Sequence, residues 1–186
     1  MTHVILRSDR LRLLPLSDEH MDLEYLLDTD PEVMRYVGGP ALDRTVVERS
    51  HARRMELGRQ RDGLGFWVGF AGDLFVGLLM LPPAHGPDQP DDPGVADLGY
   101  RLARPAWGAG YGREAVRLLL THAFGSVGMR AVIAQTRSDN DRSRRLLEAV
   151  GMTHVRDFQS LDAAPGAPLD SEYRLSRKEW RTKPVG

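Results

Sequence analysis

Three glycines at alternate positions, Gly108, Gly110 and Gly112, stand between a predicted strand over 95–102 and a predicted helix over 114–124. The absence of Cβ atoms lets successive backbone N–H groups converge on one anion. The positive end of the following helix adds to that attraction, and Arg104 and Arg113 flank the turn. The segment therefore predicts a phosphate-binding turn, with a turn used only for tight packing as the alternative.

Two other phosphate motifs are excluded by their spacing. A dinucleotide-binding fingerprint that starts at Gly108 would require a third glycine at position 113, where Arg113 stands. A kinase-type phosphate loop would have to end in Gly-Lys-Ser/Thr, which is absent here.

The remaining elements follow from hydrophobic periodicity and from capping and turn residues. A strand is predicted over 4–14, with Leu11 and Leu13 on one face. A helix capped by Ser17 is predicted to bury Leu23, Leu26 and Leu27. Other predicted features are helices from Asp30-Pro31 and from Asp43, a hairpin over 66–70 and 74–81, a proline-rich loop over 82–94, a strand over 131–136, a helix from 139 to 147 ended by Gly151, and strands over 153–161 and 171–176 around a loop over 162–168. This order predicts a single domain over 1–186, with its core at about 8–180, built on one mixed α/β sheet.

Composition excludes several classes of function. A net charge of −1, from 25 basic and 26 acidic residues, gives no global reason to expect a nucleic-acid or membrane partner. The chain has no cysteine, so acyl transfer must be direct or pass through oxygen or nitrogen. Its first residues lack a signal pattern, and no apolar run approaches the roughly 18 residues of a spanning helix. We therefore expect a cytoplasmic protein. The six histidines have no metal-binding spacing, and we expect no metal.

Three motifs in order resemble those of the GNAT superfamily of N-acetyltransferases. They are Asp97-Leu-Gly-Tyr-Arg-Leu102, Trp107-Gly-Ala-Gly-Tyr-Gly-Arg-Glu-Ala115, and Asn140-Asp-Arg-Ser143 through Leu147-Glu-Ala-Val-Gly-Met152. The chain looks most similar to the branch of ribosomal-protein N-terminal alanine and serine acetyltransferases, which also has an Arg-Leu-x-Leu strand like 10–13 and a segment like 30–37. Trp107 replaces the glutamine or arginine that is usual in the superfamily, as it often does in this branch.

The resemblance implies a mostly antiparallel sheet flanked by helices, with splayed strands where acetyl-coenzyme A binds. It places the pantetheine arm along 99–104, where Leu102 and Ala103 would contribute backbone groups, and the pyrophosphate at the glycine turn. The cofactor-binding residues that it implies are Leu102, Ala103, Arg104, Trp107, Gly108, Ala109, Gly110, Tyr111, Gly112, Arg113, Asn140 and Ser143. Arg144 and Arg145 are mostly solvated in this interpretation, although they could meet a coenzyme phosphate.

Ser143 is the candidate proton donor to the leaving thiolate, since the tyrosine found seven residues after the asparagine in many relatives is Leu147 here. Asn140 could instead be a helix cap and Ser143 an ordinary first-turn hydroxyl. Asp97 is the candidate base that accepts a proton from the amine, with Glu172 as a rival. An outward polar residue of a half-buried strand is the alternative for Asp97.

The predicted function is direct transfer of an acetyl group from acetyl-coenzyme A to a primary amine. The acceptor is a protein N-terminus or a small molecule, and the sequence does not choose between them. The other hypothesis is a non-catalytic acyl-coenzyme A sensor, which would keep the glycines but need no acid. A homodimer is expected from the resemblance.

Overall fold

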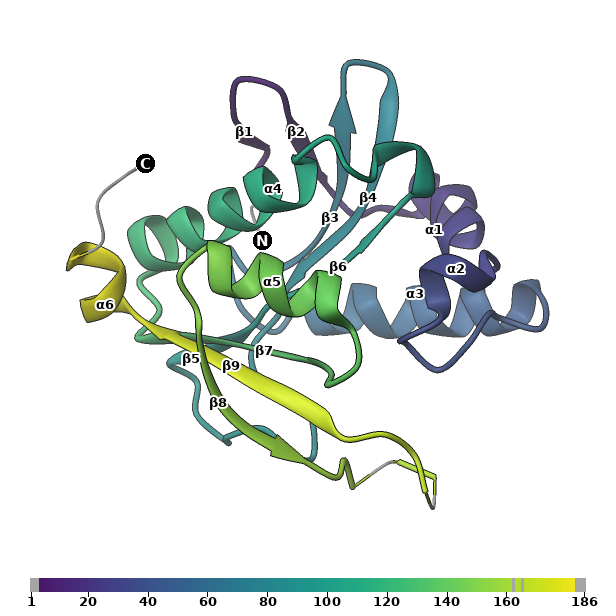
Figure 1. The fold of residues 1–186 in the computed structure, drawn as a ribbon. Helices are drawn as coiled ribbons and strands as arrows, with labels where there is room; N and C mark the ends of the chain where they lie inside the picture. The colour runs from purple at the N-terminus through teal and green to yellow at the C-terminus, as the bar shows by residue number, and fades with distance from the viewer. Residues whose placement is uncertain (1–3, 162, 165, 183–186) are drawn as a thin grey trace.

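The strands of the computed structural model, which describes residues 4–161, 163–164 and 166–182, form two sheets that meet at one long strand (Figure 1). The five-stranded sheet has the order β1-β2-β3-β4-β6, with β1 Leu6–Arg7, β2 Arg12–Pro15, β3 Gly65–Ala71, β4 Leu74–Leu81 and β6 Gly99–Leu102. The four-stranded sheet has the order β5-β7-β9-β8, with β5 Val95–Asp97, β7 Ala131–Arg137, β9 Asp170–Ser176 and β8 Thr153–Phe158. Every pairing is antiparallel except β5 with β7. The predicted mixed α/β class is therefore confirmed.

The segment 95–102 links the two sheets. Its first half, β5, pairs with β7, and its second half, β6, pairs with β4. The division falls at Leu98, whose N–H still donates to the Ile133 carbonyl at 2.8 Å. Beyond this point β6 and β7 belong to different sheets. The single sheet predicted from the element order is therefore two sheets, which separate where splayed strands were expected.

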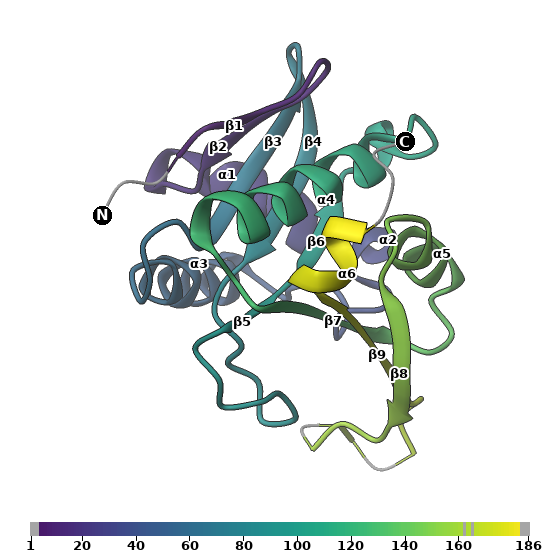
Figure 2. The same cartoon turned by 90° about the vertical axis from the view of Figure 1, so that its left-hand side faces the viewer.

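Helices cover both faces of the strands (Figures 1 and 2). On one side lie α1 Met21–Asp28, α2 Pro31–Met34 and α3 Arg44–Gly58, with α1 and α3 packed on the first sheet. On the other side α4 Tyr111–Thr121 contacts β1 and β4, while α5 Asp141–Ala149 contacts β7 and β8. Helix α6, Arg177–Thr182, follows β9 and was not predicted. Helices α4 and α5 therefore flank the division between the sheets.

The main hydrophobic core joins the two sheets beneath α4 and α5. It contains Leu13, Val76 and Leu79 of the first sheet and Val132 and Tyr173 of the second, all with no exposed surface. A second cluster, which includes Leu27, Val68 and Leu78, lies under α1 and α3. The sheets are therefore apolar on the faces that the helices cover.

Two predicted elements differ from the structure. The strand over 4–14 is a hairpin, because the chain turns between Ser8 and Leu11, where the Ser8 N–H donates to the Leu11 carbonyl at 3.0 Å. Leu11 and Leu13 are buried as predicted. Helix α1 buries Leu27 but leaves Leu26 61% exposed, and its buried face instead carries Glu24 and Asp28. The apolar stripe predicted for this helix is therefore wrong.

The helices of the described ranges are too short or too polar to cross a membrane. The longest of them, α3, is also among the more polar, with arginines and glutamates on much of its surface.

Candidate active site

The backbone of β6 presents amide groups to the division between the sheets. Ladder hydrogen bonds of an antiparallel pair use alternate residues, and the Ala103 N–H donates to Val76 on the β4 side at 2.9 Å. The amides of Tyr100 and Leu102 therefore face away from β4, on the side where Leu98 still pairs with β7. Because β6 pairs with β4 alone among the described strands, these amides are available to an extended ligand.

The backbone of Ala103 is not available in this way. Its N–H bonds to Val76, and its carbonyl accepts from the Ala106 N–H at 2.9 Å. This corrects the expectation that Ala103 offers backbone groups to the pantetheine arm. The Leu102 carbonyl accepts from the Trp107 indole Nε1 at 2.8 Å, so Trp107 fixes the turn against β6. The guanidinium of Arg142 lies 5.2 Å above the Trp107 ring.

The glycine turn opens α4 without any side chain that caps the helix. Gly108 and Gly110 have φ values of +78° and +82°, the left-handed region that glycine adopts without strain. Gly110 is the N-cap residue of α4 and supplies no side-chain acceptor, which leaves the first amides of the helix for a ligand. Gly108, Ala109 and Gly110 are exposed, and Gly112 is buried between Leu102 and Leu146. This is the geometry of an anion site.

Arg10 lies beside this turn and was not predicted as a site residue. Its Nη1 donates to the Ala109 carbonyl at 3.1 Å, and its Nε donates to Glu114 at 2.7 Å. Its guanidinium also lies 4.8 Å from the centre of the Tyr111 ring. No local signal in the sequence points to this contact, because Arg10 and Ala109 are 99 residues apart.

The other predicted cations lie in different settings. Arg104 donates through Nε to Asp30 at 2.8 Å, which directs it toward the start of α2, and Arg113 is exposed in the first turn of α4. Arg144 bonds to the Tyr173 hydroxyl and the Ser138 carbonyl, so it faces β9. Arg142 beside Trp107, rather than Arg144, is therefore the α5 arginine next to the glycine turn.

Asn140 and Ser143 lie at the start of α5. Asn140 is the N-cap, and its Oδ1 accepts from the Ser143 N–H at 3.2 Å. The predicted cap is therefore present, and it leaves the Asn140 Nδ2 group free of that bond. The Ser143 Oγ lies 2.9 Å from the Tyr100 hydroxyl, which reaches it from β6. Tyr100 was missed as a site residue because its position in a strand predicts only packing.

Asp97 lies at the end of β5 and is only 6% exposed. Burial raises the pKa of its carboxyl, while a hydrogen bond from Gln89 and the charge of His85 oppose the shift. His85 Nδ1 is 3.8 Å from the nearer carboxylate oxygen. The alternative interpretation of Asp97 as an outward polar residue is therefore wrong, because the 82–94 loop covers its side chain. A buried carboxyl with a raised pKa is suited to accept a proton near neutral pH.

Glu172, the rival base, is already committed to other groups. Its Oε2 accepts from Gln135 at 2.9 Å and from the Arg156 guanidinium at 3.2 Å. A carboxylate paired with an arginine is a weaker proton acceptor than an unpaired one. The geometry therefore favours Asp97.

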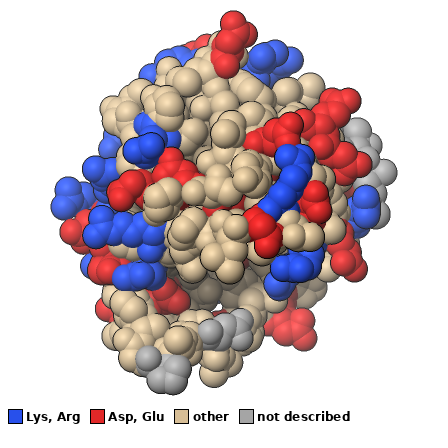
Figure 3. Space-filling view, turned by 90° about the vertical axis from the view of Figure 1, so that its right-hand side faces the viewer, with Lys and Arg blue, Asp and Glu red and all other residues tan. Residues whose placement is uncertain are grey.

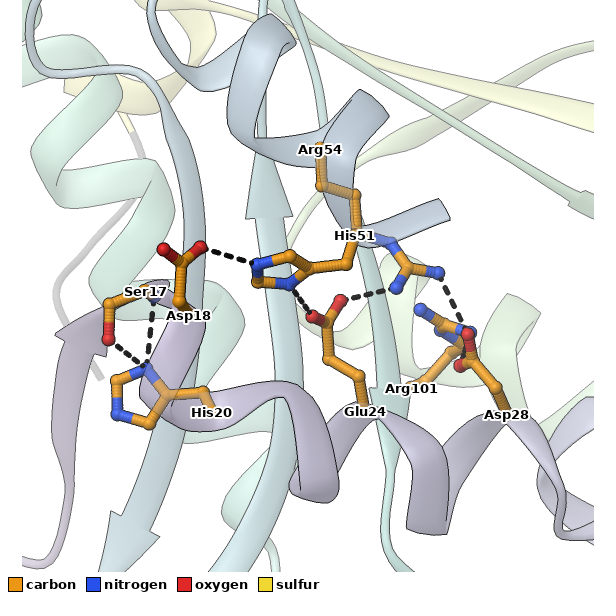
Figure 4. Close-up of polar contacts among 8 residues, drawn as sticks. All are labelled: Ser17, Asp18, His20, Glu24, Asp28, His51, Arg54 and Arg101. Carbon is orange, nitrogen blue, oxygen red and sulfur yellow. Dashed lines mark hydrogen bonds and ion pairs between the residues drawn. The ribbon is translucent and has the colours of Figure 1, made fainter. Parts of the chain in front are cut away.

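A chain of buried charges supports β6 from the face opposite to α4 (Figure 4). Arg101 of β6 pairs with Asp28 of α1, and Arg54 of α3 contacts both Asp28 and Glu24. His51 of α3 links Glu24 to Asp18, which reaches the surface. Burial and the charge of Arg54 lower the pKa of Arg101 to about 10 despite Asp28. The polar face of α1 thus anchors the strand that borders the candidate site.

A hollow on the described surface lies elsewhere. It has a volume of about 560 Å³ and is bordered by β8, β9 and α6, with Thr153, Arg174 and Lys178 in its lining. None of the predicted site residues lines it. Within residues 4–161, 163–164 and 166–182, no three His, Asp or Glu side chains are grouped to hold a metal ion.

Comparison with known proteins places these motifs in a family. A family model described as an acetyltransferase (GNAT) domain matches residues 10–153. The chain is 34% identical over 182 residues to FsC-acetyl coenzyme A-N(2)-transacetylase of Aspergillus fumigatus, a match that covers 94% of this chain and 77% of that protein.

Solved structures show the same fold. The acetyltransferase from Agrobacterium tumefaciens has a TM-score of 0.75 at 24% identity, over 94% of this chain and 95% of that one. RimL, a ribosomal L7/L12 alpha-N-protein acetyltransferase solved with coenzyme A, has a TM-score of 0.78 at 17% identity, over 95% of this chain and 99% of that one.

Proposed function

The chain belongs to the GNAT acetyltransferase family and is an acetyl-coenzyme A-dependent N-acetyltransferase, and we propose that its active site is the division between β6 and β7. The observation that carries this proposal is the alignment of three features along one strand: the glycine turn at its end, the outward amides of Tyr100 and Leu102, and Ser143 beside Tyr100. Their order matches a ligand with a pyrophosphate, an extended amide-containing arm and a sulfur.

Each part of acetyl-coenzyme A has matching groups in this arrangement. The uncapped amides of 110–112 and the adjacent Arg10 and Arg142 favour a pyrophosphate. The Tyr100 and Leu102 amides suit the carbonyls of the pantetheine arm, which would extend the sheet edge. Asn140 and Ser143 lie where that arm would end. Acetyl-coenzyme A supplies the activated acetyl group, and the protein supplies position and proton transfer.

The chemistry needs few side chains. The amine nitrogen bonds to the thioester carbonyl carbon, and the carbon–sulfur bond breaks with its electron pair left on sulfur. We assign the proton lost by the amine to Asp97, which then releases it to solvent, and the proton gained by sulfur to Ser143, whose oxygen takes a proton back from solvent. Holding both reactants in one orientation can contribute roughly 7–11 kcal/mol in favourable cases, and a positioned base contributes typically about 10²–10⁴-fold.

The acceptor amine is proposed to enter on the face of segment 95–102 that carries Asp97. Side chains alternate along a strand, so Asp97, Gly99 and Arg101 share that face, and Gly99 places no side chain between the other two. The Met80 side chain covers Gly99, since a Cβ at Gly99 would lie 2.7 Å from Met80 Cε. Figure 3 shows the side of the molecule that carries α2, and acidic and basic side chains are intermixed on it. A protein N-terminus and a small-molecule amine therefore both remain acceptor classes.

The test is incubation with acetyl-coenzyme A and a panel of small amines and peptides with free N-termini. We expect release of the coenzyme thiol, and mass spectrometry should find an acceptor heavier by one acetyl group. Thermal stabilisation by acetyl-coenzyme A without turnover of any acceptor would favour the non-catalytic sensor instead. If acetyl-coenzyme A gives no stabilisation and no acceptor is acetylated, both hypotheses are contradicted.

The homodimer, the cytoplasmic location and the absence of metal and nucleic-acid partners stay predictions. Light scattering of the purified chain tests the dimer directly. Turnover that is unchanged by a chelator is the expected result for a reaction without metal.

A further inference from the structure

Two hydroxyl groups meet at the point where the proposed thioester would lie. The Tyr100 hydroxyl comes from β6 and the Ser143 hydroxyl from α5, and their oxygens are 2.9 Å apart. The Tyr100 hydroxyl also lies 3.4 Å from the Ser143 carbonyl, at the long end of the range for a hydrogen bond. The two α5 atoms within hydrogen-bond distance of the Tyr100 hydroxyl therefore both belong to Ser143.

The direction of the hydrogen bond between them follows from their surroundings. Burial raises the pKa of Tyr100 to about 12, with the bond to Ser143 opposing the shift, so the phenol keeps its proton at neutral pH. A phenol oxygen has one proton to give, and the two acceptors within its reach are the Ser143 Oγ and carbonyl. The shorter contact, 2.9 Å against 3.4 Å, favours the Ser143 Oγ as the acceptor of the phenol proton.

This direction leaves the Ser143 proton available. Among the residues that the structure describes, Tyr100 is the sole hydrogen-bond partner of the Ser143 Oγ. A hydroxyl that accepts one hydrogen bond can still donate its own proton to another group. The Ser143 N–H, meanwhile, is held by Asn140, which fixes the residue in the first turn of α5.

We propose that Tyr100 is a positioning residue that orients the Ser143 hydroxyl, so that the Ser143 proton points at the sulfur of the bound thioester. This inference rests on the proposed function, which places the sulfur beside Ser143. When the carbon–sulfur bond breaks, the electron pair moves to sulfur, and the Ser143 O–H donates a hydrogen bond to it. Tyr100 keeps its own proton throughout and strengthens the Ser143 donor by polarising it.

The matched variants are Tyr100→Phe and Tyr173→Phe, each of which removes one phenol oxygen. Tyr173 on β9 also bonds to α5, through Glu148 at 3.0 Å and Arg144 at 3.2 Å, but it does not contact Ser143. If Tyr100 served only to dock α5, the two variants would behave alike. Ser143→Ala and the Tyr100→Phe/Ser143→Ala double variant complete a cycle.

We expect Tyr100→Phe to slow single-turnover acetyl transfer about tenfold with coenzyme affinity within twofold of the parent, and Tyr173→Phe to leave both unchanged. The double variant should be no slower than Ser143→Ala alone. Replacement of Tyr100 by fluorotyrosine, which keeps the hydroxyl, should retain the parent rate and covers the case in which Tyr100→Phe fails to fold.

A readout independent of turnover is the ionisation of coenzyme A bound to the protein, followed by the ultraviolet absorbance of its thiolate. A hydrogen bond from Ser143 favours the thiolate, so Ser143→Ala and Tyr100→Phe should each reduce the thiolate fraction at a given pH, by about tenfold and threefold. If Ser143→Ala changes neither rate nor ionisation, the proposed role of Ser143 fails. If Ser143→Ala has these effects but Tyr100→Phe has none, or if the two losses multiply, the role of Tyr100 fails.

Discussion

At the residue scale, the glycine turn depends on backbone conformation. Gly108 and Gly110 adopt positive φ values that cost other residues roughly 1–2 kcal/mol. A Cβ at Gly108 would meet nothing within 4 Å, and one at Gly110 would meet only Arg10 Nη2, at 3.5 Å. Packing therefore does not require glycine at these two positions. The open space and the turned amides are consistent with a bound anion instead.

Gly110→Val should weaken binding of coenzyme A at least about tenfold, because it strains the turn and puts bulk where the phosphate is expected. Isothermal calorimetry measures the affinity. The control is Gly125→Ala, at a glycine where a Cβ also meets nothing within 4 Å but no positive φ is required. Equal affinities for parent and Gly110→Val would show that the pyrophosphate binds elsewhere.

The raised pKa of Asp97 predicts the pH dependence of acetyl transfer. A general base works when it is deprotonated, so kcat/KM should fall as the pH drops through a value above that of a solvated aspartate, about 3.9. Asp97→Asn should lower kcat/KM about 10²–10⁴-fold and remove this acid limb. Asp91→Asn, at an exposed position of the same loop, is the control. An acid limb that survives in Asp97→Asn would assign the base to another group.

The residues that the sequence could identify are those whose role lies in the backbone or in a local motif. Glycine spacing identified the turn, and the Asn-x-x-Ser motif identified the cap of α5 that holds Ser143. Arg10, in the turn between β1 and β2, and Tyr100, in β6, were missed because their partners Ala109 and Ser143 are 99 and 43 residues away in the sequence. Such contacts depend on tertiary packing, which local spacing does not encode.

At the element scale, the polar face of α1 explains how β6 is supported. Glu24 and Asp28 are buried and paired with Arg54, Arg101 and His51, so their cost of desolvation is offset by two arginines and, when it is protonated, by His51. Hydrophobic periodicity predicted the helix α1 correctly, but it predicted that the leucine side of the helix is the buried face. This prediction was wrong because basic partners on α3 and β6 stabilise buried acidic residues, and periodicity does not reveal such partners.

His51 makes this support sensitive to pH. Burial lowers the pKa of His51, but hydrogen bonds to Glu24 and Asp18 outweigh burial, so its net pKa is raised. A histidine whose pKa is higher in the folded than in the unfolded state stabilises the fold when it is protonated. This contribution is complete below the pKa of the unfolded state, about 6.5, and is lost as the pH rises through the pKa of the folded state. Urea unfolding of the parent should therefore show a loss of stability as the pH rises above about 6.5, and His51→Gln should remove this loss. His154→Gln, at an exposed histidine, should retain the loss, and an unchanged slope in His51→Gln would contradict this account.

At the scale of the whole molecule, one hydrophobic core holds together two sheets that separate along β6 and β7. The core keeps α4 and α5 on either side of the division, so the glycine turn and Ser143 are fixed relative to the same strand. Element order and type were largely predictable from periodicity and caps. The position of the division at Leu98 was not predictable from the sequence. It depends on tertiary pairing, because β5 pairs with β7 while β6, the next part of the same segment, pairs with β4.

A crystal structure of the complex with coenzyme A tests the central claim most directly. The account predicts the pyrophosphate within hydrogen-bond distance of amides in 108–112, the pantetheine arm paired with Tyr100 and Leu102, and the sulfur beside Ser143. Coenzyme A bound outside the division between β6 and β7, for example in the hollow lined by Thr153, Arg174 and Lys178, would contradict it.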